Sequence, residues 1–518
     1  MSFTQTQRVV VVGGGPTGLS VALLLEKRGY RNIQVLERTD VNAPENDRSY
    51  QFLINGRGQR LTDRLELTEA ISKNGVPSSQ FRNITVFETN GELITKATPT
   101  LDEKSIEDYW IPRVALMRVL RERVEKSENI QVHYKVECND MVISSDSKGN
   151  VVTVYGRQVE RNVVGAITPV NDIKSWEADL VIGCDGINSK VRTSLATQYP
   201  ENHKFEKTTL PSDSANLRYK MLALQPKFVL KKGEIITDKY LRSTPDKGYV
   251  IASKFTQANK RLRLGLLPVR EEYPRFANVI TEGNHHIWKL HNKEEVQTFL
   301  QESFPQLDIS MFTTPEELDR FARSKGGIFP MPQYVNSMYK TLDNSNIGIV
   351  LLGDALHAFP PDLGQGVNSG LEDVVALDEA LEATNDALKE ALPLLEKKRM
   401  PEIKALCRLM QFGFPYQYNQ KPIMSKLFYS NFALRIGLNK ILPKVFSKPA
   451  FFLIQDHKLS YTDILRRAHR TTARICGILF LCTFGSCYHR IPLAAKTKSL
   501  LFRMLSLPYF LFVFIGMK

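Results

Sequence analysis

A run of four valines that ends in a glycine-rich turn, RVVVVGGGPTG at 8–18, constrains this chain more than any other feature. Four consecutive valines are typical of a buried parallel strand, and an apolar helical pattern follows the turn at once. The spacing satisfies G-x-G-x-x-G: Gly13 permits the tight turn, Gly15 lets the backbone approach a diphosphate, and Gly18 lets helix and strand pack closely. A second strand, NIQVLE, ends in Glu37, whose carboxylate can accept bonds from ribose hydroxyls. The sequence therefore predicts a dinucleotide-binding βαβ unit at its start.

Two later segments repeat the pattern of a buried strand, a turn and a helix start. DLVIGCDGINSKVR at 179–192 places Asp185 and Gly186 at a strand end, and NIGIVLLGDALHAFPPDLGQG at 346–366 places Gly353 and Asp354 at another. Ligands bind at the carboxyl ends of the strands in open α/β sheets. In the third segment a helix opens at Gly364-Gln365-Gly366, and its first N–H groups can stabilise negative charge on a reduced isoalloxazine ring. One such turn does not separate FAD from NAD, but three of them favour FAD.

The order of strand-like and helix-like segments predicts an α/β domain that is interrupted by insertions. Residues 215–267 hold β-like runs that indicate an antiparallel sheet, and residues 129–155 alternate as a hairpin would. We expect a doubly wound, Rossmann-like FAD-binding domain, an inserted antiparallel-sheet substrate domain and a helical, membrane-associated C-terminus. The expected boundaries are 1–74, 111–194 and 341–385 for the FAD-binding domain, 75–110 and 195–340 for the substrate domain, 386–465 for a C-terminal helical region and 466–518 for a membrane-associated tail.

Positive charge is concentrated towards the C-terminus. Residues 395–518 hold 21 Lys and Arg against 4 Asp and Glu, whereas the first 394 residues hold 48 against 51. The six cysteines include no C-x-x-C pair, so neither a disulfide framework nor a metal site is expected. Few cysteines suit a reducing, intracellular compartment, and the residues ahead of the first strand are too few for a signal peptide.

The three glycine segments resemble the fingerprints of the para-hydroxybenzoate-hydroxylase-like class of single-component flavoprotein monooxygenases. The resemblance implies bound FAD, reduction by NADPH or NADH without a second Rossmann domain, and transfer of oxygen from O2 to a small aromatic substrate through a flavin C4a-hydroperoxide. It also implies that Arg113 lies near the FAD phosphates and Arg48 near the flavin. His357 and Pro361 of the third segment are expected on the flavin side, His357 mainly in a conformational role and Pro361 shaping the flavin face.

Within this class the chain is most similar to the kynurenine 3-monooxygenase family. The resemblance implies that Asn368 contacts the substrate, and that Tyr416 or Tyr418 does so from the C-terminal region. The motifs that carry it are Arg48-Ser49, Asn55-x-Arg57-Gly58, Gly75-Val76-Pro77, FPQL at 304–307 and GQGVNSGLED at 364–373.

The chain departs from that family where the substrate carboxylate binds. The family places an arginine just after Gly-Ile-Pro, whereas Ser78 follows Gly75-Val76-Pro77 here, so Arg82 reaches the pocket only if the register shifts. The family also has a tyrosine shortly after this arginine, whereas residues 94–101 contain no tyrosine. A carboxylate bound without a guanidinium loses a charge-assisted pair. Kynurenine therefore competes with other aromatic or amphipathic substrates.

The C-terminal tail combines apolar and basic residues. The apolar segments 475–488 and 500–516 are both shorter than the roughly 20 residues of a full membrane span. Basic residues precede each segment, which suits an anionic membrane surface, and the family resemblance implies an intracellular membrane, the mitochondrial outer membrane. A buried hairpin is the alternative. Nucleic-acid binding is not expected, because phenylalanine-rich segments do not suit contacts with the phosphate backbone of a nucleic acid.

Three functions remain open from the sequence. The first is an aromatic hydroxylase, and the second is an epoxidase or reductase that acts on a lipid-like substrate on the same fold. The third is a non-catalytic flavoprotein tethered to a membrane. Ligand-stimulated NAD(P)H oxidation separates the two enzymes from the third function.

Overall fold

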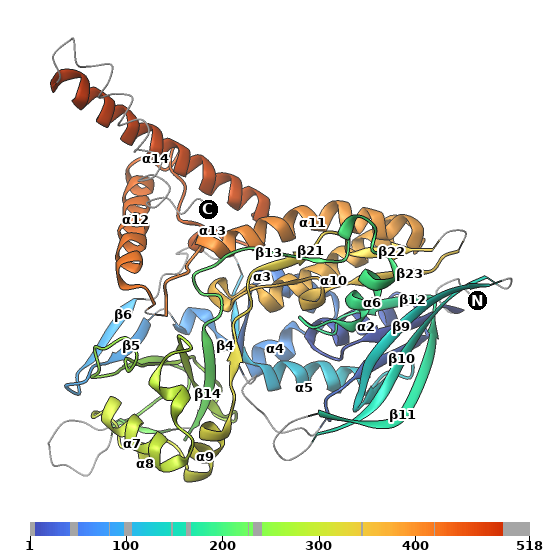
Figure 1. Ribbon diagram of the computed structural model, residues 1–518, viewed down its shortest axis with the longest axis horizontal. Coiled ribbons are helices and arrows are strands. Elements are labelled where there is room, and N and C mark those ends of the chain that lie inside the picture. Colours follow the sequence, from blue (N-terminus) through green and yellow to red (C-terminus); the bar gives the residue numbers. More distant parts are fainter. Residues whose placement is uncertain are drawn as a thin grey trace.

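The computed structural model describes an α/β body, a second sheet domain and C-terminal helices that project from them (Figure 1). Arg48, Arg82 and the apolar segment 500–516 lie outside the described residues, so their expected roles stay predictions. The described residues are 6–41, 50–81, 83–97, 106–146, 149–161, 167–225, 227–230, 241–342, 345–418 and 420–490.

A six-stranded sheet in the order β22-β23-β12-β1-β2-β8 forms the centre of the first domain. Its strands run parallel except for β22, which pairs antiparallel with β23 at one edge. All residues of β12 and β23 are buried, which is typical of parallel strands covered on both faces. The strands are β1 (Arg8–Val12), β2 (Asn32–Glu37), β8 (Ile130–Tyr134), β12 (Leu180–Gly183), β22 (Tyr339–Thr341) and β23 (Gly348–Leu351).

Helices from distant parts of the chain cover this sheet and share one apolar core with it. α2 starts directly after the glycine turn and is buried from Gly18 to Leu25. α10 packs on α2, α3 and α11, and so brings the third glycine segment back against the first. The helices are α2 (Pro16–Lys27), α3 (Gly56–Arg64), α4 (Thr68–Asn74), α5 (Arg113–Val124), α6 (Lys190–Gln198), α10 (Gly366–Ala383) and α11 (Leu388–Phe412).

A seven-stranded sheet with its own apolar core forms the second domain, at the lower left of Figure 1. Its order is β20-β14-β19-β18-β17-β5-β6, and all neighbours are antiparallel except β17 and β5. Every second residue of β19 is buried, so one face of the sheet packs on the core and the other does not. The elements are β5 (Asn83–Phe87), β6 (Leu93–Ala97), β14 (Arg218–Leu224), β17 (Gly248–Ala252), β18 (Arg263–Leu266), β19 (Arg275–Thr281), β20 (Gly327–Ile328), α7 (Lys293–Ser303), α8 (Ile309–Phe312) and α9 (Pro315–Arg323).

The hairpin expected at 129–155 is wrong at its start. β8 pairs with β2 in the parallel sheet, and the hairpin is formed by β9 and β10, which β11 extends to three strands. An alternation of apolar and polar residues predicts a strand but does not predict the strand with which it pairs. The remaining strands are β9 (Val136–Asp146), β10 (Gly149–Arg161), β11 (Ile167–Ala178), β3 (Gln51–Ile54), β4 (Val76–Pro77), β7 (Tyr109–Pro112), β13 (Lys207–Thr209), β21 (Gln333–Val335), β24 (His357–Ala358), β15 (Val229–Leu230) and β16 (Leu241–Arg242).

The C-terminal region contains α12 (Pro422–Ile441), α13 (Ala450–Leu453) and α14 (Tyr461–Arg490), and α14 projects from the body as the red helix in Figure 1. α14 runs straight through the expected boundary at 465/466. Its first turns belong to a third apolar core with α11 and α13, and burial continues as far as Ile475. None of the helices in the described part of the chain is long and apolar enough to span a bilayer.

Candidate cofactor and substrate site

The first glycine turn leaves open space at one glycine and none at two others. Gly13 has φ +104°, a conformation that side chains rarely adopt, and a Cβ added there would lie 2.3 Å from the Cys184 carbonyl oxygen. A Cβ added at Gly18 would lie 1.8 Å from the Gly13 carbonyl oxygen, so α2 packs directly on the turn. A Cβ at Gly15 would meet no atom within 4 Å. Gly15 therefore borders free space at the N-terminus of α2, where backbone N–H groups favour an anion.

Glu37 lies over the same turn, at the carboxyl end of β2. Its Oε2 accepts a hydrogen bond from the Gly14 amide at 2.7 Å, and its Oε1 accepts one from the Thr39 amide at 2.7 Å. A carboxylate oxygen can accept more than one hydrogen bond. The Glu37 side chain is thus held over the turn by two backbone amides, and its bonds to ribose hydroxyls stay a prediction.

The second and third segments meet this turn. Cys184, directly after β12, touches Gly13. Gly353, two residues after β23, touches the first turn of α2, since a Cβ added there would lie 2.9 Å from Thr17 Oγ1. The three segments therefore converge at the carboxyl ends of β1, β12 and β23, the edge at which open α/β sheets bind ligands. Each of the turns places a glycine at positive φ: Gly13, Gly186, Gly353 and Gly364.

The surroundings of this meeting point fit an FAD molecule. A Cβ at Gly186, Gly364 or Gly366 would also meet no atom within 4 Å. Asp185 accepts backbone hydrogen bonds from the start of α6 through Oδ2, while its Oδ1 is buried without a partner among the described residues. Asp354 is exposed to solvent, and desolvation by the surrounding protein raises its pKa. Open glycine faces, free carboxylate oxygens and the N-termini of α2 and α10 suit a long ligand with phosphates and hydroxyls.

A fully buried ion network holds the third segment to α11. Asp373 accepts hydrogen bonds from the Gly353 amide and from His357 Nε2, each at 2.8 Å, and from Arg399 Nε at 2.6 Å. Burial acts to raise the pKa of Asp373, but His357 and Arg399 outweigh it and leave the pKa below its ordinary value. The network fixes the turn that carries Asp354. Sequence patterns missed Arg399, because it follows two lysines in a helix and resembles a solvated charge.

His357 and Pro361 have different environments. The His357 ring is 1% exposed, stacks on Phe359 with ring centroids 5.8 Å apart, and uses Nε2 for the bond to Asp373. This arrangement supports the conformational role expected for His357. Pro361 is exposed and opens the 3₁₀ turn η5 (Pro361–Leu363), directly before Gly364.

A second buried carboxyl group lies in η5. Asp362 is 4% exposed, its Oδ2 accepts a hydrogen bond from the Ser214 hydroxyl, and the Tyr418 phenol approaches the same carboxyl group. Burial raises the pKa of Asp362 to about 7, against the opposing effect of these hydrogen-bond donors. The neutral acid is therefore accessible near pH 7, beside the helix start at Gly366. We did not predict Asp362 from the sequence, although its place between Pro361 and Gly364 was a signal.

Asn368, expected to contact the substrate, is fully buried and engaged within the protein. Its Nδ2 donates to the carbonyl oxygens of Leu53 at 2.7 Å and Gly364 at 3.1 Å, and its Oδ1 accepts from the Asn55 amide at 3.1 Å. Both amide hydrogens are used, so the side chain fastens α10 to the end of β3. The geometry supports a positioning role for Asn368 more than a substrate contact.

The two candidate tyrosines point to different partners. The Tyr416 hydroxyl donates to Asp213 Oδ2 at 2.5 Å, on a loop of the substrate domain. Tyr418 lies against Asp362 and so against the flavin-side loop. Arg113 is half-buried as the first residue of α5, and its contact with FAD phosphates stays a prediction.

The chain is similar to known proteins over most of its length. A family model described as "FAD binding domain" matches residues 6–409. The kynurenine 3-monooxygenase of Sus scrofa is 24% identical over 476 residues, which cover 90% of this chain and 87% of that protein. The kynurenine 3-monooxygenase of Salinispora tropica is 24% identical over 479 residues, which cover 90% and 91%.

Solved structures share the fold. The tetrameric form of 2-methyl-3-hydroxypyridine-5-carboxylic acid oxygenase has a TM-score of 0.51 at 17% identity and covers 79% of this chain and 90% of its own. Tetracycline destructase Tet(55) has a TM-score of 0.51 at 14% identity and covers 82% of this chain and 96% of its own. At these identities the likeness shows the arrangement of the domains and not the substrate.

Proposed function

Because this chain belongs to the FAD binding domain family, we propose that it is an FAD-dependent monooxygenase that uses NAD(P)H and O2 to hydroxylate a small aromatic substrate. The convergence of three glycine turns at the carboxyl ends of β1, β12 and β23 carries the proposal. The similarity to kynurenine 3-monooxygenases over nine-tenths of the chain supports a kynurenine-like aromatic substrate.

The residues of the chain have separate tasks in this reaction. The amides at the start of α2, next to Gly15, bind the diphosphate, and Glu37 and Asp354 hold hydroxyl groups. Bound FAD would supply the chemistry for hydride acceptance from NAD(P)H and for the activation of O2. The start of α10 at Gly366 stabilises negative charge next to it, because its free N–H groups point outward from the helix. A neutral Asp362 adds no opposing charge there.

The test is a screen of aromatic ligands against the full-length, FAD-loaded protein. We expect a yellow protein whose NADPH or NADH oxidation is stimulated by a ligand, kynurenine included, and a product heavier by one oxygen in mass spectrometry. A flavin-free Gly15→Val variant serves as the matched control and should show no oxidation. Ligand binding without any turnover would contradict the proposal and favour a non-catalytic flavoprotein; an oxygen added across a double bond would identify an epoxidase.

We also propose that the C-terminal helices rest on an anionic membrane surface. α12 has no buried side chain, and several of its apolar residues are exposed, including Ile423 at 76% and Ile441 at 75%. α14 presents Ile478 to Leu481 at exposures between 38% and 69%, after four arginines within 466–474. Apolar side chains beside basic ones favour an interfacial position, which needs no membrane span.

Removal of residues 477–518 tests the membrane contact. A cut at 466 would destroy packed residues of α14, since Ala468, Thr471 and Ile475 are all buried, whereas 477–518 begins beyond them. We expect the truncated protein to keep FAD and to move from the membrane fraction to the supernatant. An unchanged membrane fraction would contradict the proposal for this segment.

A further inference from the structure

Two serine hydroxyls connect the buried carboxyl group of Asp362 to the protein surface. The Ser214 hydroxyl donates a hydrogen bond to Asp362 Oδ2, and the hydroxyl oxygens of Ser212 and Ser214 lie 3.1 Å apart. A hydroxyl has only one proton to donate. Because Ser214 gives its proton to Asp362, Ser212 is the donor to Ser214, and both hydrogen bonds point toward the carboxyl group. Ser214 is 0% exposed, whereas Ser212 is half-buried and reaches solvent.

The second oxygen of this carboxyl group has no donor. Asp362 Oδ1 is buried and makes no hydrogen bond with any residue that the structure describes. Since Oδ2 accepts from Ser214, the proton of the neutral acid lies on Oδ1. Asp362 stands two residues before Gly364, where an added Cβ would meet no atom within 4 Å. One oxygen therefore belongs to the serine chain, and the other is left for a group bound beside Gly364.

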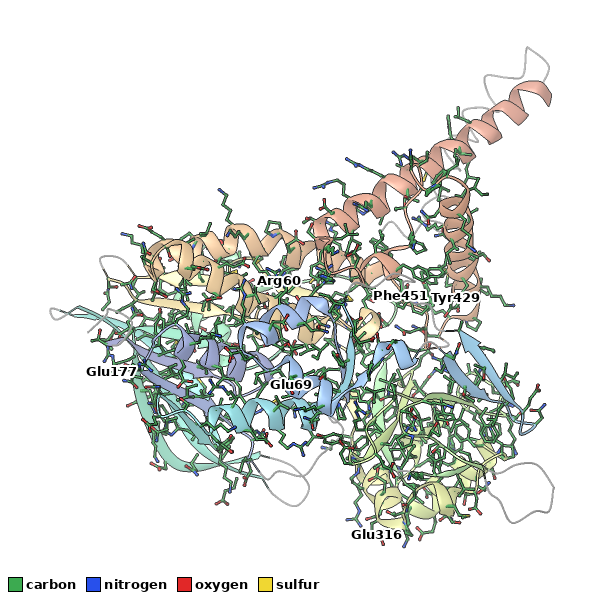
Figure 2. All side chains as sticks on the ribbon, turned by 180° about the vertical axis from the view of Figure 1, so that it is seen from behind. Arg60, Glu69, Glu177, Glu316, Tyr429 and Phe451 are labelled. Atoms are coloured by element: carbon green, nitrogen blue, oxygen red, sulfur yellow. The ribbon has the colours of Figure 1, made fainter. Side chains whose placement is uncertain are left out.

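Apolar groups of the C-terminal region cover the same loop. Leu363 belongs to the apolar core that α11, α13 and α14 form, and a Cβ added at Gly413 would lie 2.8 Å from it. Phe414 contacts Tyr429 and Phe451 with ring centroids 5.9 and 4.6 Å apart. Figure 2 shows Tyr429 and Phe451 next to each other on the C-terminal helices. These ring contacts offer a proton no chain of hydrogen bonds, in contrast to the two serines.

The other polar neighbours of Asp362 are uncharged. Gln417 Nε2 donates to the backbone carbonyl oxygen of Asp362 at 3.1 Å, and the Tyr418 phenol approaches the carboxyl group. Burial raises the pKa of Tyr418 well above its ordinary value, so the phenol keeps its proton. With only neutral groups beside it, the Asp362 carboxyl has a pKa of about 7. A group whose pKa lies near the ambient pH takes up and gives up a proton at low cost.

The proposed hydroxylation takes up one proton from solvent in each turnover. A substrate C–H bond, O2, NAD(P)H and one proton give a C–O–H group, water and NAD(P)+. One oxygen atom enters the substrate, and the other leaves as the water that contains the added proton. A site that keeps bulk water away from the reacting atoms needs a defined path for this proton.

We propose that Ser212, Ser214 and Asp362 form a relay that carries this proton from solvent into the site, an inference that rests on the proposed function. Asp362 releases the proton on Oδ1 into the site while Oδ2 receives the proton of Ser214. Ser214 takes the proton of Ser212, and Ser212 takes one from water. Each O–H bond that breaks is matched by one that forms, so the net change is one proton moved inward. Rotation of the hydroxyls and of the carboxyl group restores the starting arrangement.

Exchange of the Asp362 proton with D2O tests the relay without turnover. Infrared spectra of the full-length, FAD-loaded protein below neutral pH contain the C=O band of protonated carboxyl groups, and the band that Asp362→Asn lacks belongs to Asp362. We expect Ser214→Ala to slow the exchange of this band by about 10-fold or more, because it breaks the chain. Ser214→Thr keeps the hydroxyl and should exchange like the wild type. Ser194→Ala is the matched control, because the buried Ser194 hydroxyl also donates to an aspartate, Asp140, at 2.9 Å.

Turnover gives a second measurement. We expect kcat to fall by about 100-fold in Asp362→Asn and by about 10-fold in Ser214→Ala, where a water molecule can take the place of the hydroxyl. The KM for the substrate and the affinity for FAD should stay unchanged in both variants, because the proton moves after binding.

The outcomes separate the relay from the proposed function. If Ser214→Ala holds its FAD and exchanges as fast as the wild type, or if Ser194→Ala slows the exchange equally, the relay is wrong. The absence of any band that depends on Asp362 also overturns it. If the exchange depends on Ser214 but no ligand gives an oxygenated product, the proton path stands and the proposed function fails. Product formation at the wild-type kcat in Asp362→Asn overturns the relay alone.

Discussion

Two buried aspartates of the third glycine segment, Asp362 and Asp373, differ in their electrostatics although both are nearly inaccessible. Asp373 is 0% exposed and binds His357 and Arg399, which hold its pKa below the ordinary value despite its burial. Asp362 is 4% exposed, contacts only uncharged donors among the described residues, and has a pKa raised to about 7. The partners of a carboxyl group, more than its burial, therefore decide whether it carries charge.

The same contrast separates two parts of the site: the glycine turns, called the cofactor side, and the surroundings of Asp362, called the substrate side. On the cofactor side, Gly13, Gly18 and Gly353 are packed so closely that no Cβ fits, and the ion network of Asp373 fixes the turn beside them. On the substrate side, Asp362 is held by Ser214 and Tyr418 from distant parts of the chain. We infer that the cofactor side is rigid and permanently charged, whereas the substrate side carries a group that changes its protonation near neutrality.

Gly15→Val should have the largest effect, because it closes the cofactor side without disturbing its packing. Gly15 has φ −77°, which valine adopts, and an added Cβ meets no protein atom within 4 Å. The variant should therefore fold but purify without FAD, as measured by its absorbance spectrum and by FAD titration. Gly437→Val on α12, where a Cβ also meets nothing within 4 Å, is the matched control and should remain yellow. A yellow Gly15→Val protein would show that this open space is not the diphosphate site.

Asp373→Asn should be the next most damaging change, because it removes the nearer of the two carboxylates that pair with Arg399 among the described residues and leaves Glu372, 3.6 Å away. Breaking a buried ion pair of this kind costs about 4 kcal/mol of unfolding free energy. Urea unfolding of the FAD-loaded protein measures the loss. Asp319→Asn removes one partner of an exposed pair with Arg323 and should change stability by less than about 0.5 kcal/mol. Equal effects of the two variants would contradict the importance of the network.

Local sequence patterns predicted the glycine turns well, because the requirements of a tight turn are local. Glycines at positive φ follow directly from the spacing of GGGPTG and from the later turns. The substrate side was not predictable in this way. Asp362 lies in a loop of prolines and glycines, PPDLG, and only its contacts with Ser214 and Tyr418, from distant parts of the chain, reveal its buried surroundings. The ion network was hidden for the same reason, since its partners come from different helices.

Asp362→Asn should stabilise the protein at high pH, opposite in sign to Asp373→Asn. The native pKa of about 7 lies above that of an unfolded aspartate. As pH rises from about 4 to 7, the unfolded chain releases a proton that the native state retains, so the wild type loses stability through this window. Asparagine has no proton to release and can still accept from Ser214. The variant should gain about 4 kcal/mol at pH 8 and almost nothing at pH 4.

Urea unfolding at both pH values measures this difference. Asp213→Asn, directly before Ser214, is the control, because the Asp213 carboxylate already pairs with Lys421 and accepts from Tyr416. Loss of that charge should not stabilise the protein at any pH. A pH-independent effect of Asp362→Asn would show that this carboxyl is ionised in the native state, and the contrast with Asp373 would then disappear.

Tyr461→Phe should have the smallest effect and tests whether α14 reaches the cofactor side. The buried Tyr461 hydroxyl donates to Gln365 Oε1 at 3.0 Å, directly before α10, and Arg57 stacks over its ring at 4.3 Å. Phenylalanine keeps the ring but leaves Gln365 with an unpaired buried oxygen, at a cost of about 1 kcal/mol. Because Gln365 precedes the helix start that faces the site, FAD affinity should also fall by about 3-fold, in keeping with a loss below 1 kcal/mol. Tyr155→Phe on β10 controls for the loss of a hydroxyl. A loss of stability with unchanged FAD affinity would mean that α14 contributes to the stability of the fold and not to the binding of FAD.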